Sequence, residues 1–411
     1  MSDIKFIEGG VTAPLGFIAG GIHCGLRKNK VKLDLAAIAV KPGINAAAAA
    51  VYTQNKVFGA PITVTREHLQ NGRAKAVIVN SGIANTCTPD GIDKANAMCR
   101  IAAKALGVDE SDVIVASTGV IGSPLPIEPI ESGMPRLAAE LTDTREGGEN
   151  AAVAIMTTDT RKKEFAMEFT LGGKTVRIGL IAKGSGMIEP NMATMLSFVT
   201  TDAAISPALL QKSLSAVIVD TFNMVSIDGD TSTNDMVSVL ASGQAGNAEI
   251  TREDEDYKVF TEALYKISRE AAQNIAFDGE GATKLLECIV SNAKDCDSAR
   301  KLAKSVIKSS LVKAMMFGAD ANFGRVLCAL GYSGANFDPW KVDVKFRSAA
   351  GEIAVCKNGA SIYVDEEKAK EILLKERIEI LVNMHDGNNE ATAWGCDLSY
   401  EYVRINGDYR S

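Results

Sequence analysis

The chain has 411 residues, of which 46% are hydrophobic and 23% are charged, and its formal net charge is −7. This composition is typical of a folded globular protein and excludes an intrinsically disordered one. The acidic balance disfavours nucleic acid as a partner, because a surface that binds phosphates needs an excess of basic residues.

Runs typical of strands and helices alternate along the chain, which predicts an α/β or α+β sandwich. A weak boundary near residues 280–295 separates a C-terminal subdomain of about 285–411. The charged segment Glu249–Lys258 indicates a solvated helix start, and Ser206 can cap a helix whose first residue is Pro207. The expected strands, in chain order, are Leu35–Val40, Ala76–Asn80, Val113–Ser117, Glu164–Leu171, Thr175–Ala182, Met195–Thr200, Leu285–Ser291, Val342–Arg347 and Arg377–Asn383. The expected helices are Ile92–Leu106, Ile127–Leu141, Glu149–Met156, Pro207–Val219, Tyr257–Ala276 and Asp297–Val312.

Neither a secretory signal nor a membrane span is predicted, so we expect a cytoplasmic protein. The first five residues lack a basic segment followed by an apolar one. Apolar runs such as Ala46–Tyr52 are far shorter than the ~20 residues that a membrane-crossing helix needs. The eight cysteines are scattered, without a C-x-x-C pair or a cysteine–histidine cluster at zinc spacing. Reduced, mostly packed thiols are therefore expected, and no metal site is predicted.

The segment Gly184–Thr194 is the candidate reactive site, because it places the Thr194 hydroxyl directly after the small residue Ala193 and a loop with glycine and proline. A threonine hydroxyl needs a base, commonly a histidine held by a third group, and none of the three histidines lies in such a context. If the Ala193–Thr194 bond were cut, the free α-amino group of Thr194, with a pKa of roughly 7.7–8.0, could be that base. The hydroxyl could make the cut by an N-to-O acyl shift, in which it attacks the Ala193 carbonyl and water then hydrolyses the resulting ester. The alternative is a turn at Pro190-Asn191 followed by an ordinary strand over Ala193–Thr200.

Thr118 and Gly119 form a second candidate site, because they follow the apolar residues Val113–Ala116. A hydroxyl and a backbone N–H at the end of a strand suit an oxyanion hole, in which preorganised donors stabilise developing negative charge. A simple exit from a strand into a turn is the alternative.

Several segments with glycine or small polar residues follow one another in a fixed order: Gly9–Gly16, Ser117–Gly119, Lys183–Leu196, Asp228–Asp235, Gly318–Arg325 and Asp397–Ser411. Together they resemble the ornithine acetyltransferases, which are the glutamate N-acetyltransferases of arginine biosynthesis. The resemblance covers essentially the whole chain. It implies a layered αββα sandwich of the self-processing N-terminal-nucleophile type, with a C-terminal α+β subdomain.

The resemblance also assigns roles to individual residues. It implies that Thr194 is the nucleophile and is cleaved from Ala193, which gives an α chain of residues 1–193 and a β chain of 194–411. It places Thr118 and Gly119 in the oxyanion hole. The substrate-contacting positions that it implies are Thr157, Lys183, Thr194, Glu280, Asn406 and Ser411. Among these, Lys183 and the region of Asn406 suit the α-carboxylate of an amino acid, and Glu280 suits an amine.

Three positions depart from the family pattern. Ile83 stands where a polar residue is expected, Phe323 replaces a tryptophan, and Ser411 replaces a terminal threonine. Serine keeps the hydroxyl, whereas Ile83 puts the fine positioning of substrate in doubt.

The implied reaction is ping-pong transfer of an acetyl group from N2-acetylornithine to glutamate through acetyl-Thr194, without a metal or organic cofactor. Acetyl-CoA as a second donor is left open, and the family implies an α2β2 assembly. Two alternatives remain at this point. One is a self-processing aminopeptidase or amidohydrolase of the same superfamily, which would release its acyl group to water. The other is a non-catalytic binding protein, which would not be processed.

Overall fold

The computed structural model describes residues 4–189 and 195–407, whose contacts group into two compact units. The first unit contains residues 4–184, 195–223 and 231–271, and the second contains 185–189, 224–230 and 272–407. The predicted Ala193, Thr194 and Ser411 positions lie outside the described residues. None of the described helices is long and apolar enough to cross a membrane.

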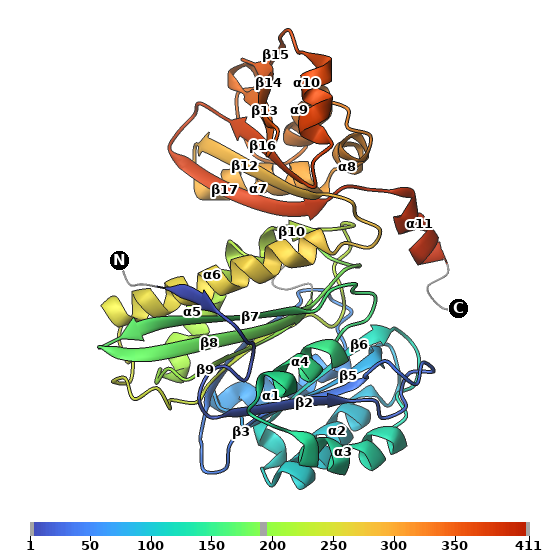
Figure 1. Ribbon diagram of the computed structural model, residues 1–411, viewed down its shortest axis with the longest axis vertical. Coiled ribbons are helices and arrows are strands. Elements are labelled where there is room, and N and C mark those ends of the chain that lie inside the picture. The colour runs from blue at the N-terminus through green and yellow to red at the C-terminus, as the bar shows by residue number, and fades with distance from the viewer. Residues whose placement is uncertain (1–3, 190–194, 408–411) are drawn as a thin grey trace. The chain divides into compact units, whose positions relative to one another are not determined.

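The first unit contains two stacked β-sheets with helices packed against them (Figure 1), and one helix, Arg145–Ala154, contributes to the core between the sheets. The six-stranded sheet has the order β1 (Lys5–Ile7), β7 (Lys163–Leu171), β8 (Lys174–Lys183), β9 (Leu196–Thr201), β11 (Met236–Ala241) and β4 (Ala47–Tyr52). The four-stranded sheet has the order β2 (Phe17–Ile22), β3 (Leu35–Val40), β5 (Ala76–Ile83) and β6 (Val113–Val120). The helices are α1 (Ala60–His68), α2 (Gly91–Leu106), α3 (Glu128–Glu140), α4 (Arg145–Ala154), α5 (Pro207–Val219) and most of α6 (Glu255–Phe277).

The four-stranded sheet is buried on both faces, as its nearly continuous apolar strands require. Along β3, Ala36 and Ile38 join the core between the two sheets, whereas Leu35 and Ala37 pack in the core under α2 and α3. Helix α5 packs on β4 at the outer face of the other sheet, and Ser213 of α5 is hydrogen-bonded to a hydroxyl of α6. The predicted αββα layering is therefore confirmed.

The second unit has the α+β character that the sequence predicts for a C-terminal subdomain. Its seven-stranded sheet has the order β10 (Val225–Ser226), β17 (Asn389–Cys396), β12 (Leu285–Ala293), β16 (Arg377–Asn383), β13 (Asp343–Ser348), β14 (Gly351–Lys357) and β15 (Ala360–Ser361). Its helices are α7 (Cys296–Lys308), α8 (Ser310–Phe317), α9 (Phe323–Gly331), α10 (Glu366–Leu373) and α11 (Tyr400–Gly407). Helix α7 packs on β12 and β17, and α10 packs on β13.

One predicted helix, Asp297–Val312, is wrong, because the structure breaks it into α7 and α8 at Ser309. Ser309 has extended backbone angles, and its hydroxyl accepts a hydrogen bond from the N–H of Val312 at 3.3 Å. A serine that caps the following helix therefore ends the preceding one. Helix α4 also differs from its prediction, since it begins at Arg145 and ends at Ala154. The charged segment Glu249–Lys258 does lead into a helix, which begins at Glu255.

Candidate functional site

The predicted oxyanion-hole residues, Thr118 and Gly119, lie near the end of β6, beside the end of the parallel strand β5. In the register of β5 and β6, Ser81 lies opposite Thr118 and Gly82 lies opposite Gly119, and the pairing becomes irregular immediately afterwards. Gly119 has a φ of 133°, and a Cβ there would lie 2.2 Å from the carbonyl carbon of Gly82. Only glycine fits this close approach of two backbones. The strand therefore continues through Thr118 and Gly119 to Val120, beyond the predicted Val113–Ser117.

Lys183 connects the two sheets of the first unit at this point. It is the last residue of β8 and is only 8% exposed, and its Nζ donates a hydrogen bond to Oγ1 of Thr118 at 3.4 Å. In the six-stranded sheet, Lys183 lies opposite Leu196, the first residue of β9. Lys183 thus places a positive charge beside the Thr118 hydroxyl and beside the strand that follows the predicted nucleophile.

A buried carboxylate, Asp159, organises the next part of the site. It accepts hydrogen bonds from Lys163 Nζ at 2.7 Å, from the N–H of Gly184 at 2.7 Å and from the N–H of Thr157 at 3.0 Å. Burial opposes ionisation, but the charges of Lys163 and Lys183 outweigh it and hold the pKa of Asp159 well below its usual range. Asp159 therefore brings Thr157 and the end of β8, two sequence-predicted positions, to one ionised group.

The predicted residues of the second unit form a separate pair. Glu280 is 8% exposed and its N–H donates to the carbonyl of Ser185 at 2.8 Å. The side chain of Asn406, on α11, donates to Oε2 of Glu280 at 2.7 Å. A Cβ at Gly186 would lie 2.4 Å from Oε2 of Glu280. The absence of a side chain at Gly186 thus allows the close approach of this carboxylate.

The residues before the predicted cleavage site are held by Asp228. Its carboxylate accepts from the N–H groups of Met187 at 2.6 Å and Ile188 at 2.9 Å, and from the hydroxyl of Tyr402 at 3.1 Å. Met187 has a φ of 55°, which is unusual for a residue with a side chain. Burial and the nearby carboxylate of Asp228 raise the pKa of Tyr402. The next residue along the chain, Glu189, is held in the same unit, because its carboxylate accepts a hydrogen bond from the hydroxyl of Ser226 at 2.8 Å.

Sequence reasoning assigned no individual role to Asp159 or Asn234. Asn234 lies in the Asp228–Asp235 segment, and its side chain bonds to residues beside Thr118. Asp159 follows Thr157 by two residues, and only its complete burial distinguishes it from a surface aspartate. The sequence signal that could have identified Asp159 is its position two residues after a predicted substrate contact. This signal is weak, because polar residues are common near such positions.

Two of the departures from the family pattern have structural roles. The side chain of Ile83 packs against the core under α2 and α3, and its carbonyl accepts from the Asn80 side chain at 2.9 Å. Phe323 is the first residue of α9, where Asn322 caps the helix through the N–H of Arg325 at 3.3 Å. The Gly318–Arg325 segment therefore shapes a helix start in the second unit.

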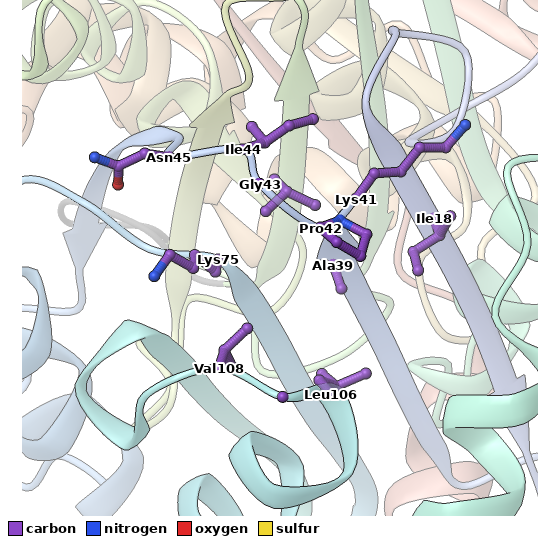
Figure 2. A pocket seen from close by; sticks show the side chains of 12 residues that line it. Ile18, Ala39, Lys41, Pro42, Gly43, Ile44, Asn45, Lys75, Leu106 and Val108 are labelled. Atoms are coloured by element: carbon purple, nitrogen blue, oxygen red, sulfur yellow. The ribbon is translucent and has the colours of Figure 1, made fainter.

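A cavity of about 490 Å³ in the first unit is lined by other residues, among them Lys41, Lys75 and Val108 (Figure 2). It lies near the end of β3 and the start of β5, whereas Thr118 lies near the end of β6, which is parallel to β5. Its two lysines are paired, Lys41 with Asp143 and Lys75 with Asp112, each at 2.6 Å. The cavity thus lies at the opposite end of the strands from Thr118, and none of the predicted site residues lines it.

Each of the three histidines contacts a backbone carbonyl or a carboxylate. His68 is hydrogen-bonded to the carbonyl of Val113, and His385 and His23 are paired with Asp343 and Asp34.

Comparison with known proteins decides the family. The model of the ArgJ family matches residues 18–411. The chain belongs to the ArgJ family. It is 49% identical to an arginine biosynthesis bifunctional protein ArgJ of Symbiobacterium thermophilum, over 99% of this chain and 100% of the relative. A relative of the same description from Caldanaerobacter subterraneus subsp. tengcongensis is 47% identical, over 99% and 100%. The family predicted from the motifs is confirmed.

A solved structure of an ArgJ protein from Bacillus halodurans is 46% identical, with a TM-score of 0.50. The match covers 52% of this chain and 99% of that chain. The solved chain is therefore about half as long as the full-length ArgJ relatives.

Proposed function

We propose that this chain cuts its own Ala193–Thr194 bond and then transfers an acetyl group from N2-acetylornithine to glutamate through an ester on Thr194. The family and the description of its relatives as bifunctional proteins of arginine biosynthesis support this acyltransferase function. The observation that carries the site is the contact between Lys183 and Thr118. Lys183 also lies opposite Leu196, which is two residues after Thr194 in the sequence. Lys183 is therefore a neighbour both of the oxyanion donor Thr118 and of the strand that follows the nucleophile.

In the first half-reaction, the α-amino group of Thr194 takes the proton of its own hydroxyl, and the oxygen attacks the acetyl carbonyl of N2-acetylornithine. Thr118 and Gly119 donate hydrogen bonds to the oxyanion, which preorganised donors stabilise more in the transition state than in the ground state. The C–N bond then breaks, and ornithine leaves with the proton. The chemistry needs no metal or organic cofactor, because nucleophile, base and oxyanion donors all come from the chain.

In the second half-reaction, the amine of glutamate attacks the carbonyl carbon of the acetyl-Thr194 ester, the bond from that carbon to the Thr194 oxygen breaks, the oxygen regains a proton, and N-acetylglutamate leaves. Lys183 is suited to the α-carboxylate of either amino acid, because a compact ammonium attracts a carboxylate at close range. The carboxylate of Asp159 binds the backbone N–H of Thr157 and that of Gly184, which directly follows Lys183, so Thr157 is held close to the end of β8. In the second unit, the carboxylate of Glu280 is suited to the substrate's ammonium group, and Asn406 orients that carboxylate. We assign a further substrate contact to Ser411.

The self-cleavage part of the proposal has support from the solved relative. A chain that is about half the length of its full-length relatives is what a cut near the middle of the sequence produces. We propose that the two fragments remain together and pair into an α2β2 assembly. The eight free thiols suit the reducing cytoplasm, where we expect the protein to work.

Intact-mass measurement and a denaturing gel test the self-cleavage. The wild-type protein should give two fragments, residues 1–193 and 194–411, whereas Thr194→Ala should remain one chain. A wild-type chain that stays whole after long incubation would refute both the cleavage and the mechanism, and would favour a non-catalytic protein.

Turnover of N2-acetylornithine with and without glutamate distinguishes the transferase from a hydrolase. The transferase turns over and forms N-acetylglutamate only when glutamate is present, and without glutamate it releases no more than one ornithine per active site. Release of free acetate at the same rate without glutamate would favour the aminopeptidase-like alternative. We also propose that acetyl-CoA serves as a second acetyl donor, which a glutamate acetylation assay with acetyl-CoA alone tests.

A further inference from the structure

The side-chain amide of Asn234 lies between the ends of the two sheets of the first unit. Its Nδ2 donates to the carbonyls of Ala84 at 2.6 Å and Ser117 at 3.0 Å. Its Oδ1 accepts from the hydroxyls of Thr86 and Thr233, both at 2.6 Å. The residue is 7% exposed. This amide therefore makes four hydrogen bonds in a site that is almost closed to water.

The contacts fix the orientation of the amide. A carbonyl oxygen can only accept, so the nitrogen of Asn234 must face Ala84 and Ser117, and its oxygen must take the two hydroxyls. A fully satisfied buried network of this kind holds its members in one arrangement. A carboxylate of the same shape cannot replace it, because it would place negative charge against two carbonyl oxygens.

Both ends of this network lead to the proposed reacting groups. Ser117 directly precedes Thr118 on β6. On the other side, Asn234 is two residues before Met236, whose N–H donates to the carbonyl of Met195 at 2.9 Å. Met195 directly follows Thr194 in the sequence. The amide thus links the strand of the oxyanion donors to the start of the strand that follows the nucleophile, through one hydrogen bond on each side.

We propose that Asn234 is a positioning residue for the acyl transfer. It fixes the end of β6, with Thr118 and Gly119, relative to the starts of β9 and β11. Oxyanion donors act only where their hydrogen bonds meet the oxygen of the transition state, so a small shift between these strands lowers the rate of the chemical step. Asn234 itself touches no substrate in this account. The inference rests on the proposed function.

The chain offers a matched control in Asn247. This residue is 8% exposed, its Nδ2 donates to the carbonyls of Ala204 at 3.1 Å and Ala248 at 2.8 Å, and its Oδ1 accepts from the N–H of Ala204 at 2.9 Å. Like Asn234, it is a buried amide whose nitrogen donates to two backbone carbonyls. It lies beyond the far end of β9, after Thr201. Its loss should carry a comparable folding cost without a change between β6 and the start of β9.

The test compares Asn234→Asp and Asn234→Ala with Asn247→Ala in the full-length, self-processed protein. We expect kcat, per cleaved molecule, to fall about 10²-fold in both Asn234 variants, as for a misplaced oxyanion donor. KM should change by less than about threefold, because binding in the ground state is not altered. Asn247→Ala should keep kcat within about threefold of wild type while its Tm falls by a similar amount. Equal loss of kcat in Asn234 and Asn247 variants of similar Tm would overturn the proposal.

Two further measurements keep the outcome decisive. If an Asn234 variant is not processed, the rate of self-cleavage replaces kcat as the readout, and an unchanged rate in Asn247→Ala supports the inference. Where Asn234 variants do not fold, Thr86→Val removes one hydroxyl that orients the amide and should lower kcat about tenfold, and an unchanged kcat would count against the proposal. Wild-type protein that is cleaved but transfers no acetyl group would refute the proposed function. In that case the self-cleavage rates alone would decide the role of Asn234.

Discussion

Replacement of Asp159 by asparagine tests whether one buried carboxylate holds the first unit's site together. Asp159 and Lys163 are almost completely buried, 2.7 Å apart, and the same carboxylate accepts from two backbone N–H groups. Removal of one partner of a buried ion pair leaves the other charge without compensation, which costs about 3–5 kcal/mol. We therefore expect Asp159→Asn to lower the free energy of unfolding by that amount, a large part of the about 5–15 kcal/mol typical of a domain.

Chemical denaturation of the Thr194→Ala protein, which should remain one chain, is the appropriate assay. The matched control is Asp143→Asn, because Asp143 pairs with Lys41 at 2.6 Å on the surface, where such pairs contribute little. It should leave the unfolding curve almost unchanged. Asp159→Asn combined with Lys163→Met should recover part of the loss, since the uncompensated charge is gone. A single variant no less stable than Asp143→Asn would refute this reasoning.

The pH dependence has a definite sign. Because the pKa of Asp159 is held well below its usual range in the folded state, its stabilisation is fully present above the unfolded value of about 3.9. It is lost as the pH falls through the folded pKa. The difference in unfolding free energy between wild type and Asp159→Asn should therefore stay constant from about pH 5 to 8 and shrink below about pH 4.

Three further results are expected. Gly119→Ala should lower kcat by at least about 10²-fold, because its Cβ would clash with the backbone opposite, whereas Gly331→Ala, with no positive φ and nothing within 4 Å, should keep kcat near wild type. Asp228→Asn should slow self-cleavage about tenfold in a gel time course, since it weakens the acceptor that holds the residues before the cut, and an unchanged rate would contradict that role. Iodoacetamide applied to the native protein should modify the exposed thiols and spare the buried ones, whose pKa values burial raises; mass mapping would show Cys87, Cys296 and Cys328 labelled and Cys99, Cys288, Cys356 and Cys396 unlabelled.

The centre of the fold could be predicted because its strands carry a strong local signal. Leu35–Val40 and Val113–Ala116 are continuous apolar runs, as expected for strands that are buried on both faces. Because this second run stops at Ala116, it also predicts that Thr118 and Gly119 lie at the end of a strand. Such a prediction succeeds because burial on two faces leaves few other uses for an apolar run of this length.

Strand β2 shows why other elements could not be predicted. Its sequence, Phe-Ile-Ala-Gly-Gly-Ile, contains two glycines, which weaken a strand in isolation. In the structure, a Cβ at Gly21 would lie 2.2 Å from the carbonyl oxygen of Asn150, and one at Gly147 would lie 2.4 Å from that of Ala19. The glycines allow α4 to pack directly on β2. This reason is a contact between segments about 130 residues apart, and no local pattern contains it.

The site has the same division between local and long-range information. Thr118 and Gly119 could be proposed from their place at the end of a strand, and Lys183 from its motif. Asp159 and Asn234 could not be assigned, because each acquires its role from partners distant in the sequence, such as Gly184 and Ser117. A buried aspartate or asparagine looks the same as an exposed one until the fold supplies its neighbours.

The order of strands in the six-stranded sheet explains how a chain can be cut in the middle without losing its site. Strands β9 and β11 follow the proposed cleavage point, yet they lie between β8 and β4, which precede it. A strand of one fragment therefore pairs with a strand of the other at two places, β8 with β9 over Ile178–Lys183 and β4 with β11 over the whole of β4. Because backbone hydrogen bonds and the core between the sheets both cross the cut, breaking one peptide bond releases the amino group of Thr194 but removes none of the contacts that hold Lys183, Thr118 and Asn234 in place.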